Sequence, residues 1–242
     1  MENLDTIHQA VILAGGQGTR LRPLTNDRPK PMVEVVGKPF LEHILTMLKG
    51  NGIKEVVLLL GYMPEKIIDY FGDGKNFGIK IKYSVTPVDD ETGTRIKKAK
   101  DFLDEKFLLL YSDNYWPAKL SHMHDFFKKS GALGTVTVYN NKEGFGEYGR
   151  ENNMLVADDG LVLKYDRSRK DRELNAIDIG FFILRKSILD IMPEHNFSFE
   201  AEILPKLISE QKLFAYRTDD RYYPLTSVSF LPQLEKVLGD KS

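Results

Sequence analysis

The 242-residue chain contains no cysteine. That absence excludes disulfides, zinc sites built on thiolates and cysteine nucleophiles, and it favours a cytoplasmic setting. The chain also lacks a charge imbalance, because 34 Lys and Arg against 35 Asp and Glu give a formal net charge of −1. A near-neutral chain is not expected to be a dedicated nucleic-acid binder or a polybasic membrane module. Any site for an anion must therefore be local.

Long apolar runs are absent as well. The longest apolar stretches, such as residues 56–60, are too short to span a membrane. The first residues contain neither a basic segment nor an apolar run of signal-peptide length. We find no low-complexity segment, no fixed-period repeat and no linker that would divide the chain. We therefore expect one compact domain with no membrane segment.

Strand patterns occur along the chain, and helix patterns lie between the early ones. Short apolar runs bounded by turn residues predict strands over residues 9–13, 55–60, 80–85, 107–111, 135–139 and 180–184. Helical periodicity predicts helices over residues 39–48, 64–71, 94–103 and 120–130. This alternation is typical of an α/β fold, in which a mostly parallel sheet has helices on both faces.

The pattern changes after about residue 134, where strand-like pieces follow one another. The sequence Asp158-Asp159-Gly160 predicts a hairpin turn between strands at 154–156 and 161–165. We expect a β-rich C-terminal excursion that returns to the sheet at 180–184. Further helices are predicted over residues 187–192, 199–209 and 232–238.

The most informative stretch, residues 10–30, reads AVILAGGQGTRLRPLTNDRPK. A buried strand runs directly into the glycine-rich segment 15–18. Glycines permit positive φ and a close approach of backbone to ligand, and free N–H groups in such a loop form a cradle for phosphate. Arg20 follows at once, and Lys30 lies between two prolines that stiffen its loop. Two permanent cations beside an N–H cradle would offset the charge of a triphosphate.

This stretch resembles the signature of the sugar-1-phosphate nucleotidylyltransferases, G-G-x-G-T-R-L-x-P-L-T followed by P-K-P. That family transfers a nucleoside monophosphate from an NTP to a sugar 1-phosphate and releases pyrophosphate. The resemblance is near-complete over residues 10–40 and continues less strictly to about residue 207. It is closest to the glucose-1-phosphate cytidylyltransferases and to the mannose- and heptose-1-phosphate guanylyltransferases.

The resemblance implies a Rossmann-like, GT-A-like sheet in a single nucleotidyltransferase domain spanning residues 1–242. Residues of about 9–133 would form the nucleotide-binding half, and about 134–242 the sugar-binding half with the C-terminal helices. The implied partners are an NTP and a sugar 1-phosphate, and relatives commonly form homo-oligomers.

The resemblance also implies which residues act. The glycine loop and its arginine would hold the NTP phosphates, and the lysine of P-K-P would contact the phosphate under attack. The implied catalytic residues are Arg20, Lys30 and Asp113. The implied nucleotide-binding residues are Leu13, Ala14, Gly15, Gly16, Gly18, Thr19, Arg20, Thr86, Gly93 and Thr94. In-line attack on a phosphate depends on alignment and charge neutralisation, so the reaction needs no histidine base.

A metal ligand is expected at Asp113, which directly follows a buried strand. Open α/β sheets place ligands at the carboxyl ends of their strands. The segment resembles the family's G-D-x motif, whose aspartate binds Mg²⁺, although Ser112 replaces the glycine. An alternative is that Asp113 caps the next turn. The family's second metal aspartate is missing, because Thr226 stands in its place. Either phosphates and water complete the Mg²⁺ shell, or another residue substitutes, or activity is weakened.

The base and the acceptor remain open. Residues 91–95 occupy the place of the base-reading loop, where Arg95 could reach a phosphate or the base, or could belong to a basic helix start on the surface. GTP, CTP, UTP and dTTP all fit. The resemblance implies sugar contacts at Asn153, Asp166 and Asp178.

Two other functions remain alternatives. One is a cytidylyltransferase for a phosphorylated alcohol or amine such as phosphocholine, whose cation aromatic walls would bind. Those walls would come from Tyr115, Trp116, Tyr222 and Tyr223. The other is a nucleotide-sugar-binding module that has lost catalysis, as Thr226 suggests. A dinucleotide-binding domain is disfavoured because the glycine spacing is wrong for G-x-G-x-x-G.

Overall fold

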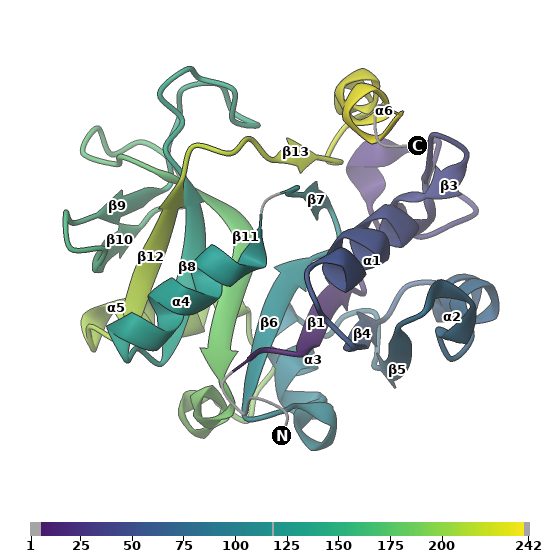
Figure 1. Cartoon of the computed structure of the whole chain (residues 1–242), viewed down its shortest axis with the longest axis horizontal. Coiled ribbons are helices and arrows are strands. Elements are labelled where there is room, and N and C mark those ends of the chain that lie inside the picture. Colours follow the sequence, from purple (N-terminus) through teal and green to yellow (C-terminus); the bar gives the residue numbers. More distant parts are fainter. Residues whose placement is uncertain (1–5, 118, 240–242) are drawn as a thin grey trace.

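A seven-stranded sheet forms the centre of the computed structural model, which describes residues 6–117 and 119–239 (Figure 1). The strand order is β12-β8-β11-β6-β1-β4-β5. The strands are β1 (Gln9–Ala14), β4 (Glu55–Leu60), β5 (Lys80–Val85), β6 (Lys106–Tyr111), β8 (Gly134–Tyr139), β11 (Ile177–Arg185) and β12 (Leu213–Thr218). Each of the six predicted strands of the sheet is present.

Most neighbours in the sheet are parallel. Strand β1 pairs parallel with both β4 and β6, and β5 pairs parallel with β4. Strand β11 is the exception, since it lies antiparallel between β6 and β8. The central strands are buried on both faces, which explains why they read as unbroken apolar runs. The predicted mostly parallel α/β sheet is confirmed.

Helices cover both faces of the sheet, as predicted. Alternate residues of β1 face two different hydrophobic clusters, Ala10 and Ile12 on one face and Val11 and Leu13 on the other. Helices α1, α2, α4 and α6 pack on the first face, and α3 and α5 on the second (Figure 1). Their bounds are α1 (Phe40–Gly50), α2 (Pro64–Phe71), α3 (Thr92–Lys98), α4 (Leu120–Ser130), α5 (Leu204–Ser209) and α6 (Leu231–Gly239). None of the helices in the described part of the chain has the length and apolar character needed to cross a bilayer.

Three predicted helices differ in form from those observed. The helix expected over 94–103 ends at Lys98 and continues as one 3₁₀ turn, Lys100–Phe102. The helix expected over 187–192 is a 3₁₀ segment, Lys186–Ile191. The helix expected over 199–209 begins with a π-helical turn, Phe199–Ile203, before α5. Proline lies in the first turn of α5 and has no N–H to donate, so the regular helix starts there.

The β-rich excursion lies beside the sheet, at the edge formed by β12 (Figure 1). Its hairpin joins β9 (Met154–Val156) to β10 (Val162–Tyr165), which are antiparallel, as predicted. The remaining short elements are strands β2 (Glu34–Val35), β3 (Lys38–Pro39), β7 (Asn114–Tyr115) and β13 (Tyr223–Pro224), and the 3₁₀ turns Thr19–Leu21, Lys30–Met32, Lys75–Phe77 and Val228–Phe230.

Candidate active site

A cavity of about 560 Å³ lies at the carboxyl ends of β1 and β6. This is the position at which open α/β sheets place their ligands. Its walls come from the glycine loop after β1, the turn at Lys30, residues 88–91 before α3, Thr92 and Arg95 of α3, and residues 111–113 at the end of β6. The predicted residues that it brings together are Leu13, Ala14, Gly15, Gly16, Gly18, Thr19, Arg20, Lys30 and Asp113.

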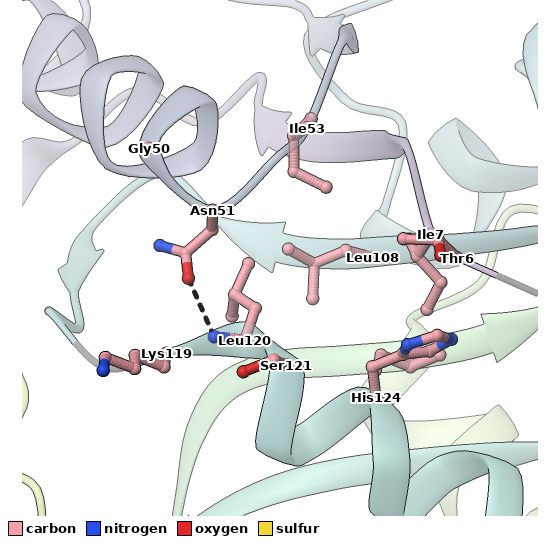
Figure 2. Close-up of a pocket in the computed structure, with 11 residues that line it drawn as sticks. Thr6, Ile7, Gly50, Asn51, Ile53, Leu108, Lys119, Leu120, Ser121 and His124 are labelled. Carbon is pink, nitrogen blue, oxygen red and sulfur yellow. Dashed lines mark hydrogen bonds between the residues drawn. The ribbon is translucent and has the colours of Figure 1, made fainter. Parts of the chain in front are cut away.

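A second cavity, of about 350 Å³, lies at the opposite end of these strands (Figure 2). Figure 2 shows Asn51 at its edge, where the side-chain oxygen accepts a hydrogen bond from the Leu120 N–H at 2.9 Å. Apolar side chains such as Ile53 and Leu108 form most of its wall. Because it contains none of the predicted site residues, the first cavity is the candidate active site.

The glycine loop folds back so that Lys30 lies against it. Gly18 has a φ of 63°, and a Cβ there would lie 2.9 Å from the Cβ of Lys30. Only glycine fits this conformation and this approach without strain. The Thr25 hydroxyl donates a hydrogen bond to the Gly18 carbonyl at 2.9 Å, which holds the returning chain in place.

Lys30 and Asp113 form an ion pair inside the cavity. Lys30 Nζ donates to Asp113 Oδ2 at 2.9 Å, and the two side chains are 12% and 26% exposed. Lys30 opens a 3₁₀ turn between Pro29 and Pro31, whereas Asp113 follows β6. The fold therefore joins two residues that lie far apart in the chain into one cation–carboxylate unit.

Arg20 is the more exposed cation, and it faces the C-terminal half. Its Nη1 lies 3.4 Å from Glu147 Oε1, and its side chain is 61% exposed. Burial alone would lower the pKa of Arg20, but a hydrogen bond with Tyr148 and the charge of Glu147 raise it. The loop that carries Glu147 and Tyr148 thus reaches the side of the cavity where Arg20 lies.

Three of the predicted nucleotide-binding residues lie outside the lining of the cavity. The Thr86 hydroxyl accepts a hydrogen bond from Arg95 at 2.6 Å. The N–H groups of Gly93 and Thr94 donate to the Phe197 carbonyl, and the Thr94 hydroxyl accepts from the Phe197 N–H. All three are occupied by protein partners, and their contact with a nucleotide remains a prediction. Residues 93–96 are buried, so the start of α3 is not a basic surface segment.

The predicted sugar-contact residues are linked by hydrogen bonds. The Asn153 side-chain oxygen accepts from the Asp178 N–H at 2.8 Å, and the Asn153 carbonyl accepts from the Asp166 N–H. The Asp166 carboxylate accepts from the Ser168 N–H in a local turn. Asp178 accepts from the Gly180 N–H at 2.7 Å, but burial dominates and raises the pKa of Asp178 to about 6.

Asp178 lies on β11, which pairs with β6, the strand that precedes Asp113. A Cβ at Gly180 would lie 2.7 Å from the Tyr111 ring, and Asn114 donates to the Ile179 carbonyl at 3.0 Å. The predicted sugar contacts Asn153, Asp166 and Asp178 do not line the cavity, but β11, which carries Asp178, pairs with β6 beside it.

Thr226 lies beside Asp113, where the second metal aspartate was expected. Strand β13 pairs with β7, and the Leu225 N–H donates to the Asp113 carbonyl at 2.7 Å. The Thr226 hydroxyl oxygen is buried and has no hydrogen-bond partner within residues 6–117 and 119–239. No cluster of three or more His, Cys, Asp or Glu that could hold a metal occurs in that part of the chain.

The comparison with protein families identifies the chain. Residues 9–224 match the family described as Nucleotidyl transferase. The chain belongs to the nucleotidyl transferase family. The family predicted from the glycine loop is thereby confirmed.

Relatives of this nucleotidyl transferase match it over most of its length. It is 36% identical over 231 residues to a probable glucose-1-phosphate cytidylyltransferase of Bacillus subtilis, covering 86% of this chain and 87% of the relative. It is 35% identical over 215 residues to D-glycero-alpha-D-manno-heptose 1-phosphate guanylyltransferase of Campylobacter jejuni, covering 88% and 92%. The crystal structure of HddC from Yersinia pseudotuberculosis complexed with GMP-PN matches with a TM-score of 0.80 and 25% identity, over 96% of this chain and all of that one. The predicted fold is confirmed.

Two features of the nucleotidyl transferase site could not be predicted from the sequence, namely the partner of Arg20 and the orientation of Arg95. The ion pair between Glu147 and Arg20 was not predicted, because no local sequence pattern indicates a partner so distant in the chain. For Arg95 the sequence left open a phosphate, the base or a surface helix start. The structure places Arg95 in the cavity lining, with its guanidinium hydrogen-bonded to Leu60, Thr86 and residues 87–88. Thr86 is close to Arg95 in the sequence, so a contact between them could be anticipated. The contact with Leu60 could not, because it depends on how β4 packs beside α3.

Proposed function

We propose that this nucleotidyl transferase joins an NTP and a sugar 1-phosphate to give an NDP-sugar and pyrophosphate. The observation that carries the proposal is one cavity in which a glycine loop, two cations and a carboxylate meet. The names of the relatives, a cytidylyltransferase and a guanylyltransferase of sugar 1-phosphates, support it. The GMP-PN complex of HddC supports nucleotide binding on this fold.

The chemistry follows from the charges around the cavity. An oxygen of the sugar phosphate attacks the α-phosphorus, the bond to the β-phosphate oxygen breaks, and pyrophosphate leaves. The loop N–H groups and Arg20 bind the triphosphate, and Lys30 neutralises charge that develops on the α-phosphate. The nucleophile is already an anion, so alignment and neutralisation suffice without a general base.

We propose Asp113 as the protein ligand of a Mg²⁺ ion. Its carboxylate oxygen is a hard donor at the cavity wall, whereas the hydroxyl of nearby Thr226 is neutral, buried and outside the cavity lining. This donor set fits an ion that takes most of its ligands from phosphates and water. When bound, the ion would stabilise negative charge on the phosphates. Lys30 would then exchange its partner Asp113 for phosphate oxygens.

The aromatic residues that suggested a phosphocholine acceptor are mostly not available to bind a cation. Trp116 is fully buried against Phe181, and Tyr115 and Tyr222 are 4% and 3% exposed. Three of the four aromatic residues proposed as cation-binding walls therefore belong to the core. The binding-module alternative stays open, because the residue near Asp113 where a second carboxylate was expected is Thr226.

The test is pyrophosphate release with Mg²⁺, using each of GTP, CTP, UTP and dTTP against a panel of sugar 1-phosphates. We expect release with one preferred pair, reduced by about 100-fold or more in Lys30→Ala and in Asp113→Ala. Lys129→Ala removes the same charge from the exposed end of α4 and should retain full activity. Tight binding of a finished nucleotide sugar without any release would contradict the enzyme and favour the binding module.

A further inference from the structure

The buried guanidinium of Arg95 lies beneath the nucleotide cavity and connects two strand ends. Arg95 belongs to α3 and is 4% exposed. Its Nη1 donates to the Leu60 carbonyl at 2.8 Å and to the Thr86 hydroxyl at 2.6 Å. Its Nη2 donates to the carbonyls of Pro87 and Val88, both at 2.9 Å. Leu60 ends β4 and Thr86 follows β5, so one side chain joins the segments that leave these two strands.

The same guanidinium packs against two glycines. A Cβ on Gly15 would lie 2.5 Å from Arg95 Cζ, and a Cβ on Gly61 would lie 2.5 Å from Nη2. Both glycines are therefore required for the group to sit where it does. Gly15 opens the phosphate-binding loop, and together with Arg95 and Val88 it lines the cavity. The glycine loop thus rests on Arg95.

The partners of Arg95 indicate that it positions the backbone rather than binding a ligand. All four hydrogens of the two terminal nitrogens have an acceptor within the protein, and each acceptor is uncharged. The nearby carboxylate of Asp90 is paired with Lys98 at 2.6 Å. A planar fork of fixed geometry can hold several carbonyls at set distances, which a lysine cannot do.

The strand order indicates which part of the substrate would lie near the segment that Arg95 holds. Strands β4 and β5 lie on one side of β1, and β6 with Asp113 lies on the other. The cations and the carboxylate of the phosphate chemistry lie toward β6. The nucleoside end of an NTP would then lie toward residues 86–90, the segment that Arg95 holds.

We infer that Arg95 is a positioning residue, which sets the spacing between the glycine loop and residues 86–90 and so shapes the wall that receives the base of the NTP. The inference rests on the proposed function, because it requires an NTP in this cavity. It assigns to Arg95 an effect on base selectivity without contact between Arg95 and the base.

The test compares nucleotide binding with binding of inorganic tripolyphosphate, which has no base. Affinities of the four NTPs and of tripolyphosphate would be measured by calorimetry for the wild type, Arg95→Gln and Arg95→Lys. We expect both variants to bind the preferred NTP about tenfold more weakly or worse and to narrow the differences among NTPs, since small displacements in a site are costly. Tripolyphosphate affinity should stay within about twofold, because the loop amides and cations remain. Lys100→Gln, an equal charge change at an exposed position just after α3, should leave all affinities unchanged.

A second variant reaches Arg95 from outside the cavity. Gly61 does not line the cavity, and Gly61→Ala should displace the guanidinium. We expect Gly61→Ala to reproduce the loss of base selectivity, and Arg95→Gln to add little in that background, because coupled residues act non-additively. Unfolding temperatures of all variants would show whether each remains folded at the temperature of the binding experiment.

Several results would overturn the inference. Wild-type affinity and selectivity in Arg95→Lys would show that charge alone suffices. Equal weakening of NTP and tripolyphosphate binding would assign Arg95 to the phosphates. Fully additive effects of Gly61→Ala and Arg95→Gln would separate the two sites. A wild-type chain that binds no NTP would overturn the proposed function and this inference together, whereas each of the other results overturns the inference alone.

Discussion

Among single residues, the half-buried Asp178, a predicted sugar contact, has a strongly shifted pKa. Its carboxylate has one backbone donor, the Gly180 N–H, and burial outweighs that bond and raises the pKa to about 6. An unfolded chain would release this proton near pH 4. Between these two values the folded state binds the proton more tightly than the unfolded state does. Ionisation of Asp178 therefore costs stability as the pH rises from about 4 to about 6.

Asp178→Asn should remove that cost while keeping an oxygen acceptor for the Gly180 N–H. We expect the stability of the variant relative to the wild type to increase between pH 4 and pH 7, by on the order of 2 kcal/mol. Urea unfolding at a series of pH values measures this difference. A difference that does not change with pH would contradict the raised pKa.

Among the elements, the loop over residues 141–150 links the C-terminal half to the predicted phosphate-binding residue Arg20. Its Glu147 pairs with Arg20, and the Glu147 N–H donates to the Tyr222 hydroxyl at 3.0 Å. Its Tyr148 contacts Arg20 and stacks under the Arg169 guanidinium at 4.2 Å. A triphosphate that binds Arg20 must compete with the Glu147 carboxylate.

Glu147→Gln should therefore bind an NTP more tightly than the wild type. An exposed ion pair contributes at most about 1 kcal/mol, so the expected gain in affinity is about two- to fivefold. Calorimetric titration with the NTP measures it. Glu143→Gln changes the charge of the same loop equally at an exposed position and is the matched control. Binding weaker than that of the wild type would instead place the Glu147 carboxylate among the groups that assist the nucleotide.

A second charge cluster lies at the start of β4, where the Glu55 carboxylate contacts side chains of both neighbouring strands, β1 and β5. Burial alone would raise the pKa of Glu55, but hydrogen bonds from Lys80, Lys82 and Gln9 outweigh it and lower the pKa to about 2. A depressed folded-state pKa contributes stability above the unfolded value, and this stability is lost as the pH falls.

Glu55→Gln should accordingly destabilise the protein at neutral pH by on the order of 1–2 kcal/mol, after allowance for solvent screening. The difference from the wild type should shrink as the pH falls from about 5 toward 2. Denaturant unfolding across this range measures it. A difference of constant size would show that the effect comes from packing, not from the charge.

At the scale of the whole molecule, β11 joins the two halves into one sheet. It lies antiparallel between β6 of the first half and β8 of the second. Phe182 on β11 is fully buried. Its ring centroid lies 6.5 Å from that of Tyr111 and 5.5 Å from that of Phe199. The halves share this core, and we propose that they unfold together.

Calorimetry should show one unfolding transition whose calorimetric and van't Hoff enthalpies agree. Phe182→Ala should lower the stability of the whole molecule by about 3–5 kcal/mol through the cavity that it creates. Leu163→Ala, at a position that is 49% exposed, should have little effect. Two separate transitions, with only one shifted by Phe182→Ala, would show that the halves are independent domains.

Local features of this protein could be predicted from its amino-acid sequence. Buried strands such as β1 can be recognised in the sequence as unbroken apolar runs, because strands covered on both faces consist mainly of apolar residues. The glycine loop, Arg20 and Lys30 were also readable, because phosphate binding needs flexible backbone and fixed charge within a short stretch. Helix ends were less readable, since the π-helical turn before α5 depends on packing as well as on its proline.

The tertiary structure alone decided which distant residues meet. The Lys30–Asp113 and Arg20–Glu147 pairs each join segments that no local pattern connects. The antiparallel entry of β11 and the burial of Trp116 also follow from the packing of the whole sheet. Arg95 shows the same limit, because a guanidinium looks alike in a sequence whether it faces a ligand or the carbonyls of its own chain. Hydrogen bonding and burial between distant segments settle that choice, and they exist only once the chain has folded.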